Sequence, residues 1–236
     1  MQSFDVNQEP WTTLQTRLDY RFRRPDLLYE AVCHRSYVNE QPDAGVADNE
    51  RLEFLGDAVL DLIVSQELFL SYPKSQEGEL TRIRAEVVAE PSLAAMARSL
   101  DLGLCLLLGR GERSSGGSDR SSLLANTLEA LLGAVFLDGG LPAATKVIKP
   151  LIKPRIIHAS KHAGHDFKSR LQEYLQAHKG GPPQYILSGM EGPDHDRHYT
   201  VQVMIDGRVH GQGHGRTKKG AEQAAARVAL KTLEVD

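Results

Sequence analysis

The chain has 236 residues, a net charge of −3 and two cysteines, Cys33 and Cys105. This length allows one large domain or two of ordinary size, and two distant cysteines exclude a disulfide framework and a cysteine-based zinc site. No apolar run reaches the roughly 18 residues of a membrane span, and the N-terminus lacks the basic and apolar blocks of a signal peptide. We therefore expect a cytoplasmic protein that makes no use of a membrane.

The charge is unevenly distributed along the chain. Residues 1–165 carry −4 and residues 166–236 carry +1, and five of the nine histidines lie in the second segment. This balance does not by itself indicate nucleic-acid binding, which usually needs a strongly basic domain. Evidence for such a partner has to come from where individual charges are placed.

The first predicted elements are two short helices over 11–18 and 25–33, the second opened by Pro25 at a favoured first-turn position. His34 and Ser36 follow it. A histidine and a serine could suggest a catalytic pair, but no third orienting group accompanies them. We expect them to cap a helix end or to form hydrogen bonds there, and we expect a polar loop over 37–48.

The next helix is predicted from an N-cap at Asp48 or Asn49 to about Leu70. At about 100° per residue, Glu50, Glu53 and Asp57 share one stripe, while apolar side chains occupy nearly every other direction. A helix of this kind is expected to be buried, where clustered carboxylates repel one another unless a cation lies among them. The stripe therefore predicts a divalent metal site. Asp61 continues it one turn further, and the spacing alone does not decide whether Asp61 belongs to the site.

Further helices are predicted over 77–88, 92–101 and 121–137, with a flexible Gly/Ser-rich loop over 109–120. Glu77 and Glu79 are placed where carboxylates favour a helix start. Asn126 and Glu129 share one face of the otherwise apolar helix 121–137. We expect this second polar patch to meet the first at a common cation held by Glu50, Glu53, Asp57 and Glu129, with Asn126 adding a neutral oxygen.

A helical segment over 142–157 ends the first domain, for which we predict residues 1–158, followed by a linker over 159–165 and a second domain over 166–236. The second domain is expected to contain a helix at 166–179, strands at 184–190, 197–205 and 208–214, and a helix at 219–233. The prediction is an all-α domain followed by an α+β domain of α-β-β-β-α order.

Three cations, Arg216, Lys218 and Lys219, stand immediately before or at the start of the last helix. Mobile cations beside free backbone N–H groups are suited to bind phosphate. The alternative is a solvated surface run, which is less favoured because a basic triplet at a helix start opposes the helix dipole.

The segment NERLEFLGDAVL at 49–60, together with 167–233 and its RTKKGAEQAAA stretch, resembles bacterial ribonuclease III. The resemblance covers nearly the whole chain. It implies an all-helical endonuclease domain that forms a symmetric homodimer, then a double-stranded RNA-binding domain with a three-stranded antiparallel sheet. It also implies cleavage of double-stranded RNA in rRNA and mRNA processing, using Mg²⁺ or, as a substitute, Mn²⁺. Two metal ions about 4 Å apart would assist hydrolysis, and the products would carry 5′-phosphate and 3′-hydroxyl ends with short 3′ overhangs.

The resemblance also assigns roles to residues. It implies metal ligands at Glu53, Asp57, Asn126 and Glu129, and catalytic acidic positions at Glu50, Asp57, Glu77 and Glu129. Phe54 matches a position that inserts into the partner subunit, the alternative being ordinary core packing. RNA contacts are implied for the first helix of the second domain, the turn after its first strand and the start of its last helix: Gln172, Glu173, His195, Arg216, Lys218 and Lys219.

One position departs from the family pattern, because Asn126 stands where the family usually carries aspartate. An amide oxygen still coordinates magnesium, although the site loses one negative charge. Two alternatives to a nuclease remain: a double-stranded RNA-binding regulator that does not cut, and a hydrolase of a small phosphorylated substrate. The second leaves the α-β-β-β-α domain unexplained.

Overall fold

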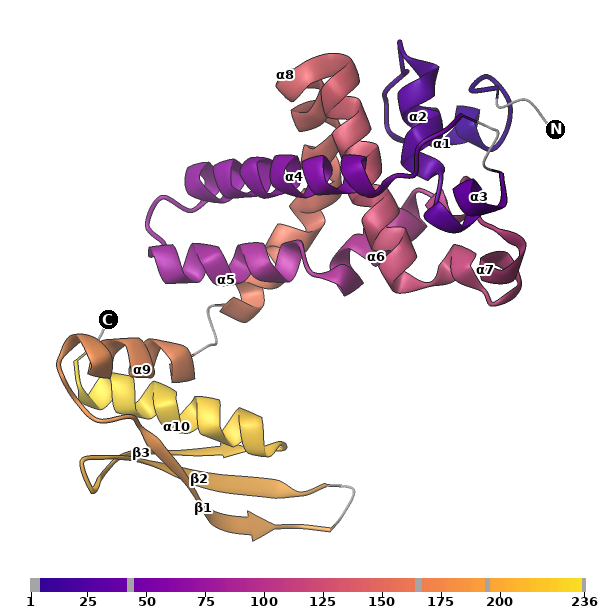
Figure 1. The fold of residues 1–236 in the computed structure, drawn as a ribbon. Helices are drawn as coiled ribbons and strands as arrows, with labels where there is room; N and C mark the ends of the chain where they lie inside the picture. The colour runs from indigo at the N-terminus through magenta and orange to yellow at the C-terminus, as the bar shows by residue number, and fades with distance from the viewer. Residues whose placement is uncertain (1–4, 42–44, 164–166, 194–195, 235–236) are drawn as a thin grey trace. The chain divides into compact units, whose positions relative to one another are not determined.

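The computed structural model describes residues 5–41, 45–163, 167–193 and 196–234. The chain divides into two compact units, Met1–Ser160 and Lys161–Asp236. Figure 1 shows that the first unit is built from helices and the second from two helices and a sheet. The division falls inside the predicted linker, and helix α8 (Ser121–Ala163) continues into it, so residues 159–163 of that linker are helical.

The described part of the first unit contains eight α-helices and two short 3₁₀ turns. The longest helix, α8, is interrupted at Gly140, whose φ of 72° and ψ of −176° are not helical, so it consists of two rods. This break separates the two helical segments that the sequence predicted there. The elements are α1 Trp11–Arg17, α2 Pro25–Val32, α3 Arg35–Glu40, α4 Glu50–Ser71, α5 Glu77–Val87, α6 Glu90–Ser99, η2 Leu102–Leu104, α7 Arg110–Ser114, η3 Gly117–Asp119 and α8 Ser121–Ala163.

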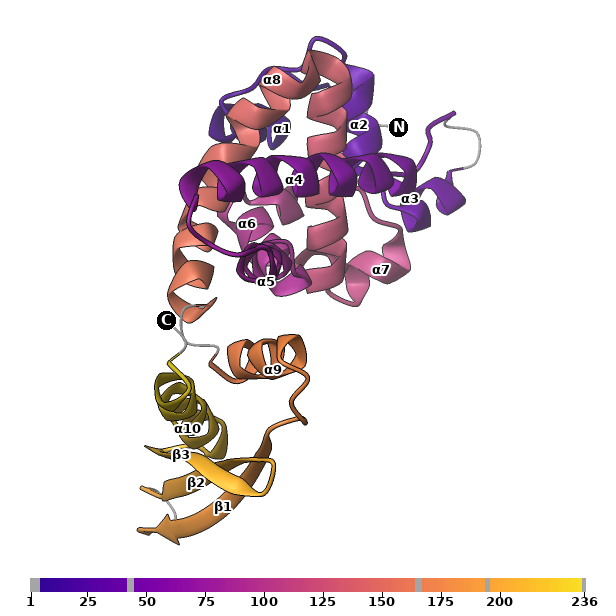
Figure 2. The ribbon, with the colours of Figure 1, turned by 90° about the vertical axis from the view of Figure 1, so that its left-hand side faces the viewer.

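The first rod of α8 lies at the centre of this unit. It buries Leu124, Leu128, Leu131 and Leu132 completely, and α4 lies across it (Figure 2). By length and composition alone, α8 is apolar enough to cross a membrane. Its buried leucines show why, because the core helix of a globular unit has the same composition.

Two predicted loops of the first unit contain helices. Residues 35–40 form α3, which begins where the His34 side chain accepts a hydrogen bond from the backbone N–H of Ser36. The segment predicted as flexible, 109–120, contains α7 and η3. It is ordered by two ion pairs, Arg98–Asp119 and Arg120–Glu112, each 2.7 Å long. The prediction was wrong because composition does not reveal these contacts.

The second unit has the predicted order. Its elements are α9 Phe167–Ala177, β1 Gln184–Glu191, β2 His198–Ile205, β3 Arg208–Gly215 and α10 Lys218–Thr232, and the sheet is antiparallel in the order β1-β2-β3. Both helices cover one face of the sheet (Figure 1). The core between them contains Leu171, Val201, Val203, Ala225 and Leu230 among its buried side chains.

Alternate glycines on β3 bring α10 unusually close to the sheet. A Cβ at Gly213 would lie 2.1 Å from the backbone nitrogen of Ala225, and one at Gly211 would lie 2.4 Å from the carbonyl oxygen of the same residue. These distances leave no space for any side chain. Glycine is therefore required on the face of β3 that receives the helix.

Candidate active site

The largest group of predicted site residues lines one cavity of about 660 Å³ in the first unit. Glu50, Glu53 and Asp57 reach it from α4, and Asn126 and Glu129 reach it from α8. The cavity thus brings together two polar patches that lie about 70 residues apart in the sequence. The remaining lining residues are His34, Arg35, Asn49, Phe54, Leu123 and Thr127.

Two glycines set the distance between α4 and α8. A Cβ built on Gly56 would lie 1.7 Å from the carbonyl oxygen of Glu129, and one on Gly133 would lie 2.3 Å from the carbonyl oxygen of Leu52. The two backbones are therefore in direct contact, which places Glu53 and Asp57 opposite the polar face of α8. The sequence analysis missed this role, although a glycine within each apolar helix was the available signal.

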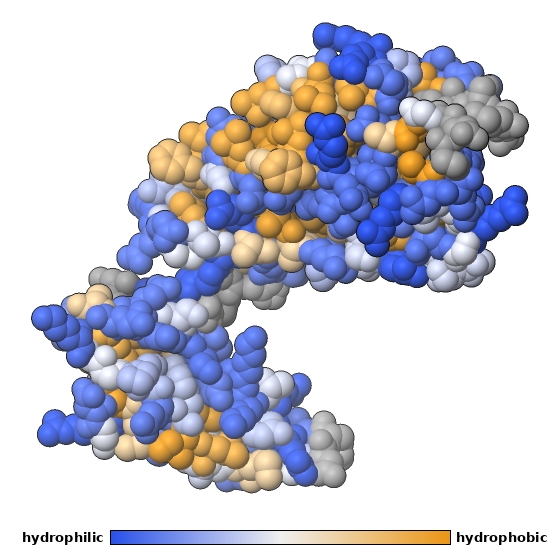
Figure 3. Space-filling view, viewed as in Figure 1, coloured by the Kyte–Doolittle hydropathy of each residue, from blue (hydrophilic) through white to orange (hydrophobic). Residues whose placement is uncertain are grey.

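The acidic stripe faces the cavity rather than the protein interior, contrary to the prediction. Glu50 and Asp57 are exposed, and Glu53 and Glu129 are partly buried. Helix α4 is also not buried on all of its apolar sides, because Phe54 is 81% exposed and Leu62 is 56% exposed. Figure 3 shows apolar atoms gathered over α4 and the adjoining part of α8. Some of the apolar residues from which we predicted a fully buried helix, such as Phe54 and Leu62, are therefore exposed at the surface.

The carboxylates of the cavity influence one another electrostatically. Burial, and then the negative charges of Asp57, Glu53 and Asp61, raise the pKa of Glu129 to about 7. Burial and the charges of Glu50 and Asp57 also raise the pKa of Glu53, whereas a hydrogen bond with Asn126 lowers it. The ionised form of Glu129 is disfavoured first because burial removes it from water and second because it adds a negative charge to this group of carboxylates.

Two acidic residues that the sequence analysis considered for the site, Glu77 and Asp61, are not among the residues that line the cavity. Glu77 begins α5, and its Oε1 accepts a hydrogen bond of 2.8 Å from the Thr81 hydroxyl. The Oδ1 atom of Asp61 is buried and has no hydrogen-bond partner among the described residues. Asp61 therefore reaches the site through its charge, which acts on Glu129.

The side chains as they lie do not form a finished coordination sphere. Among the residues that the structure describes, no three His, Cys, Asp or Glu side chains are arranged to hold a metal ion. The donor chemistry is nevertheless that of a hard divalent cation, since the α4 and α8 faces supply carboxylate and amide oxygens. The residues fit such an ion because its positive charge would offset both the burial of the Glu129 carboxylate and the repulsion from Asp57, Glu53 and Asp61.

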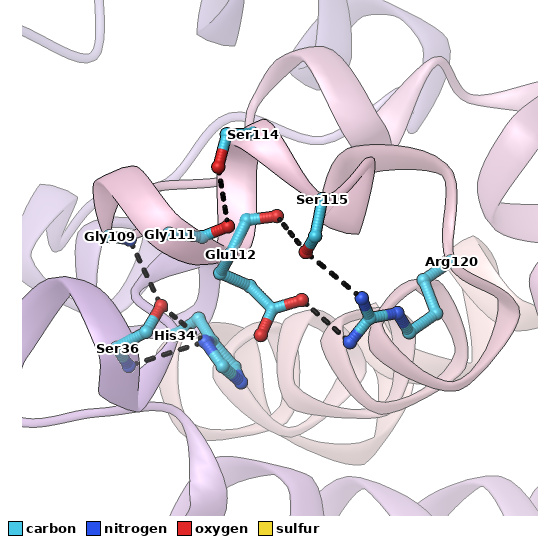
Figure 4. A network of polar contacts seen from close by, with 8 residues as sticks. All are labelled: His34, Ser36, Gly109, Gly111, Glu112, Ser114, Ser115 and Arg120. Atoms are coloured by element: carbon cyan, nitrogen blue, oxygen red, sulfur yellow. Dashed lines mark hydrogen bonds and ion pairs between the residues drawn. The ribbon is translucent and has the colours of Figure 1, made fainter.

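His34 and Ser36 form a hydrogen-bonded group beside the cavity (Figure 4). His34 Nδ1 lies 2.8 Å from Ser36 Oγ and accepts from the Ser36 backbone N–H at 3.2 Å, and Ser36 Oγ accepts from the Gly109 N–H at 3.0 Å. The predicted capping role is confirmed, although the cap begins α3 rather than ending α2.

Four of the six predicted RNA contacts lie on the helices of the second unit. Gln172 and Glu173 are exposed on α9, and Lys218 and Lys219 are exposed in the first turn of α10. Arg216 precedes this turn, 3.9 Å from Asp196. Thr217 caps the helix by accepting from the Gly220 N–H at 3.0 Å. His195 lies outside the described residues.

Comparison with known proteins gives the same division of the chain. Residues 24–156 match the Ribonuclease-III-like family, and residues 167–233 match the double-stranded RNA binding motif. Ribonuclease 3 of Syntrophotalea carbinolica is 52% identical over 222 residues, covering 94% of this chain and 96% of that protein. Ribonuclease 3 of Bacillus licheniformis is 44% identical over 231 residues, covering 98% and 93%.

A solved structure agrees with the fold of the first unit. The nuclease domain of ribonuclease III from Campylobacter jejuni has a TM-score of 0.56 and 40% identity, and it covers 61% of this chain and 96% of that one. The family match spans more than half of the sequence and the relatives span almost all of it. The chain therefore belongs to the ribonuclease III family and carries a double-stranded RNA binding motif after its nuclease domain.

Proposed function

We propose that this protein is an endoribonuclease that hydrolyses phosphodiester bonds of double-stranded RNA in the cavity between α4 and α8. The observation that carries the proposal is the meeting of four carboxylates in one cavity, with the pKa of Glu129 raised to about 7. Such a site is unfavourable without a cation and is suited to hold one. The relatives named Ribonuclease 3 and the RNA binding motif support the substrate class.

Glu53, Asp57, Asn126 and Glu129 would hold divalent cations, for which we propose Mg²⁺ with Mn²⁺ as a substitute. Bound in pairs, such ions activate a water molecule and neutralise the leaving oxygen of a phosphodiester. Glu129 would hold such an ion in its ionised form, because a carboxyl group that ligates a metal must be deprotonated. Glu50, the exposed first residue of α4, would add negative charge to the cavity. The products are 5′-phosphate and 3′-hydroxyl ends.

Phe54 supports a homodimer. Its side chain is 81% exposed and lies at the edge of a second cavity of about 710 Å³, lined by Leu27, Leu52, Leu55 and Leu137 among others. In a two-fold dimer each Phe54 would enter the partner's copy of this cavity, since the same patch serves on both subunits. The C. jejuni nuclease domain is described as having a region involved in dimer formation. Paired cuts by two subunits would leave short 3′ overhangs.

The second unit would supply affinity for the duplex. A-form RNA is recognised by its shape, through minor-groove contacts and the phosphates between successive minor grooves. Gln172 and Glu173 on α9 are proposed to face a minor groove, and Arg216, Lys218 and Lys219 to contact phosphates. His195 is proposed for the second minor groove on the basis of the resemblance alone.

The test is to incubate the protein with a long, fully paired RNA, once with Mg²⁺ and once with EDTA, and to follow fragment length and band shift. Shortening that requires Mg²⁺ is the expected result. A shifted duplex that stays intact in both conditions would favour the binding-only alternative. Asn126→Asp then serves as the comparison, because restored cleavage would identify Asn126 as the cause.

A further inference from the structure

The cavity is lined by basic side chains as well as by the acidic residues described above. His34, the N-cap of α3, and Arg35, its first residue, line the cavity with nitrogen groups, in contrast to the carboxylates of α4 and α8. Two other polar lining residues use their donors within the protein: Asn49 donates to the carbonyl oxygen of Ala31 at 3.2 Å, and Thr127 to that of Leu123 at 2.7 Å. His34 and Arg35 add imidazole and guanidinium N–H donors to the lining of the cavity.

The hydrogen bonds of His34 determine which ring nitrogen carries the proton. The backbone N–H of Ser36 can only donate, so Nδ1 must accept from it. Ser36 Oγ accepts from the Gly109 N–H and can direct its own hydrogen at Nδ1. The proton of the neutral ring is therefore on Nε2. Burial lowers the pKa of His34, although the charges of Glu112 and Glu50 oppose this shift, which agrees with a neutral ring.

The position of the ring is fixed by contacts on both sides of the turn. The His34 backbone N–H donates to the carbonyl oxygen of Leu107 at 3.1 Å, and the Leu107 N–H donates to that of Val32 at 2.9 Å. A Cβ at Gly109 would lie 2.6 Å from the Ser36 carbonyl oxygen, so this segment packs tightly against α3. The ion pair between Glu112 and Arg120 lies beside this hydrogen-bonded group (Figure 4). A donor held this firmly needs little reorganisation to bind a ligand.

We propose that His34 binds the RNA strand inside the acidic cavity, with its Nε2–H donating to a phosphate oxygen of the strand that is cut. This inference rests on the proposed function. A phosphate that enters a cavity of carboxylates needs donors on the opposite side, and His34 supplies one without adding a charge that would compete with the cations. Arg35, whose guanidinium lies 3.5 Å from Glu50 Oε1, supplies the neighbouring positive charge.

Two variants separate this role from simple helix capping. In His34→Asn the amide oxygen can replace Nδ1 as the acceptor from Ser36, but no donor remains at the position of Nε2. In His34→Gln the amide nitrogen reaches the position of Nε2 and keeps the donor. Single-turnover cleavage at saturating duplex and Mg²⁺, duplex affinity in EDTA and the thermal midpoint are measured for both variants and the unaltered protein.

We expect His34→Asn to cut about 100-fold more slowly, the typical effect of removing one positioned donor, with unchanged affinity. His34→Gln should recover most of the rate. An unaltered rate in His34→Asn, or equal losses in both variants, would overturn the inference while leaving the nuclease assignment intact. Failure of the unaltered protein to cut would overturn both.

If a His34 variant does not fold, the inference can be tested by an NMR measurement that keeps His34 and does not depend on cleavage. In Glu129→Gln protein labelled with ¹⁵N-histidine, the Nε2 resonance of His34 should report the Nε2–H tautomer and should shift when duplex and Mg²⁺ are added. His158, which lies 3.4 Å from Glu86 and does not line the cavity, serves as the internal control. A His34 resonance that does not change with duplex would overturn the inference.

Discussion

Glu129 is the carboxyl group of the cavity whose pKa is raised to about 7 by its surroundings. It lies where α8 meets the acidic stripe, and its pKa is raised to about 7 by burial and by Asp57, Glu53 and Asp61. Spacing predicted that Glu129 would face the stripe, but it did not predict this pKa, which depends on distances between two helices. Spacing also left the role of Asp61 open, and in the folded protein its charge is the smallest of the contributions that raise the pKa of Glu129.

The raised pKa predicts how the metal-free protein responds to pH. Because the folded pKa of Glu129 exceeds its unfolded value of about 4.5, its stabilising contribution is complete below pH 4.5 and is lost as the pH rises through about 7. After allowance for screening by solvent, the loss is on the order of 1–2 kcal/mol. Urea unfolding in EDTA at pH 5.5 and 8 should show it, and Glu129→Gln should remove that part of the pH dependence. Equal pH dependence in the two proteins would contradict the prediction.

At the scale of elements, the site depends on the contact between α4 and α8. The acidic spacing of α4, the polar pair of α8 and the α-β-β-β-α order are local patterns, and they could be predicted from the sequence. The Gly56–Gly133 contact, the helices α3 and α7 and the entry of His34 into the cavity could not. Each of these depends on partners distant in sequence. His34 is held by Leu107, and the segment that contains α7 is held by the contact between Arg98 and Asp119.

Gly56→Ala tests this contact. The added Cβ would overlap the carbonyl oxygen of Glu129, so the helices must separate, at a cost of about 3 kcal/mol. We expect lower thermal stability of the first unit and loss of cleavage, with duplex binding retained by the second unit. Gly111→Ala is the matched control, since nothing lies within 4 Å of its Cβ. Equal stability of the two variants would show that α4 and α8 are not held by this contact.

The first turn of α10 gives a second prediction at this scale. Lys218→Ala combined with Lys219→Ala should weaken duplex binding regardless of sequence and should reduce the salt dependence of affinity by about two phosphate contacts. Lys231→Ala, at the opposite end of α10, should leave the salt dependence unchanged. Titrations between low and moderate salt measure both. An unaltered slope in the double variant would remove these lysines from the phosphate contact.

For the whole molecule, the proposed homodimer would cover the exposed apolar surface over α4 and α8, on which Phe54 is 81% exposed. Phe54→Ala should raise the dimer dissociation constant at least about tenfold, because truncating a buried aromatic anchor typically costs 2 kcal/mol or more. Leu104→Ala, at a position 73% exposed outside this surface, is the control. Sedimentation across a range of concentrations measures both, and a Phe54→Ala dimer as tight as the control would exclude Phe54 from the interface.

The division of labour between the two units is tested most directly by Glu129→Gln, with cleavage and binding measured on the same RNA duplex. Removal of one carboxylate from the cavity should slow Mg²⁺-dependent cleavage at least about 1,000-fold, a loss comparable with that of a central catalytic group, and should leave duplex affinity unchanged. Glu79→Gln, at the start of α5 and away from the residues that line the cavity, should match the unaltered protein in both measurements. Cleavage by Glu129→Gln at the unaltered rate, or a parallel loss of binding, would contradict the assignment of this cavity as the cutting site.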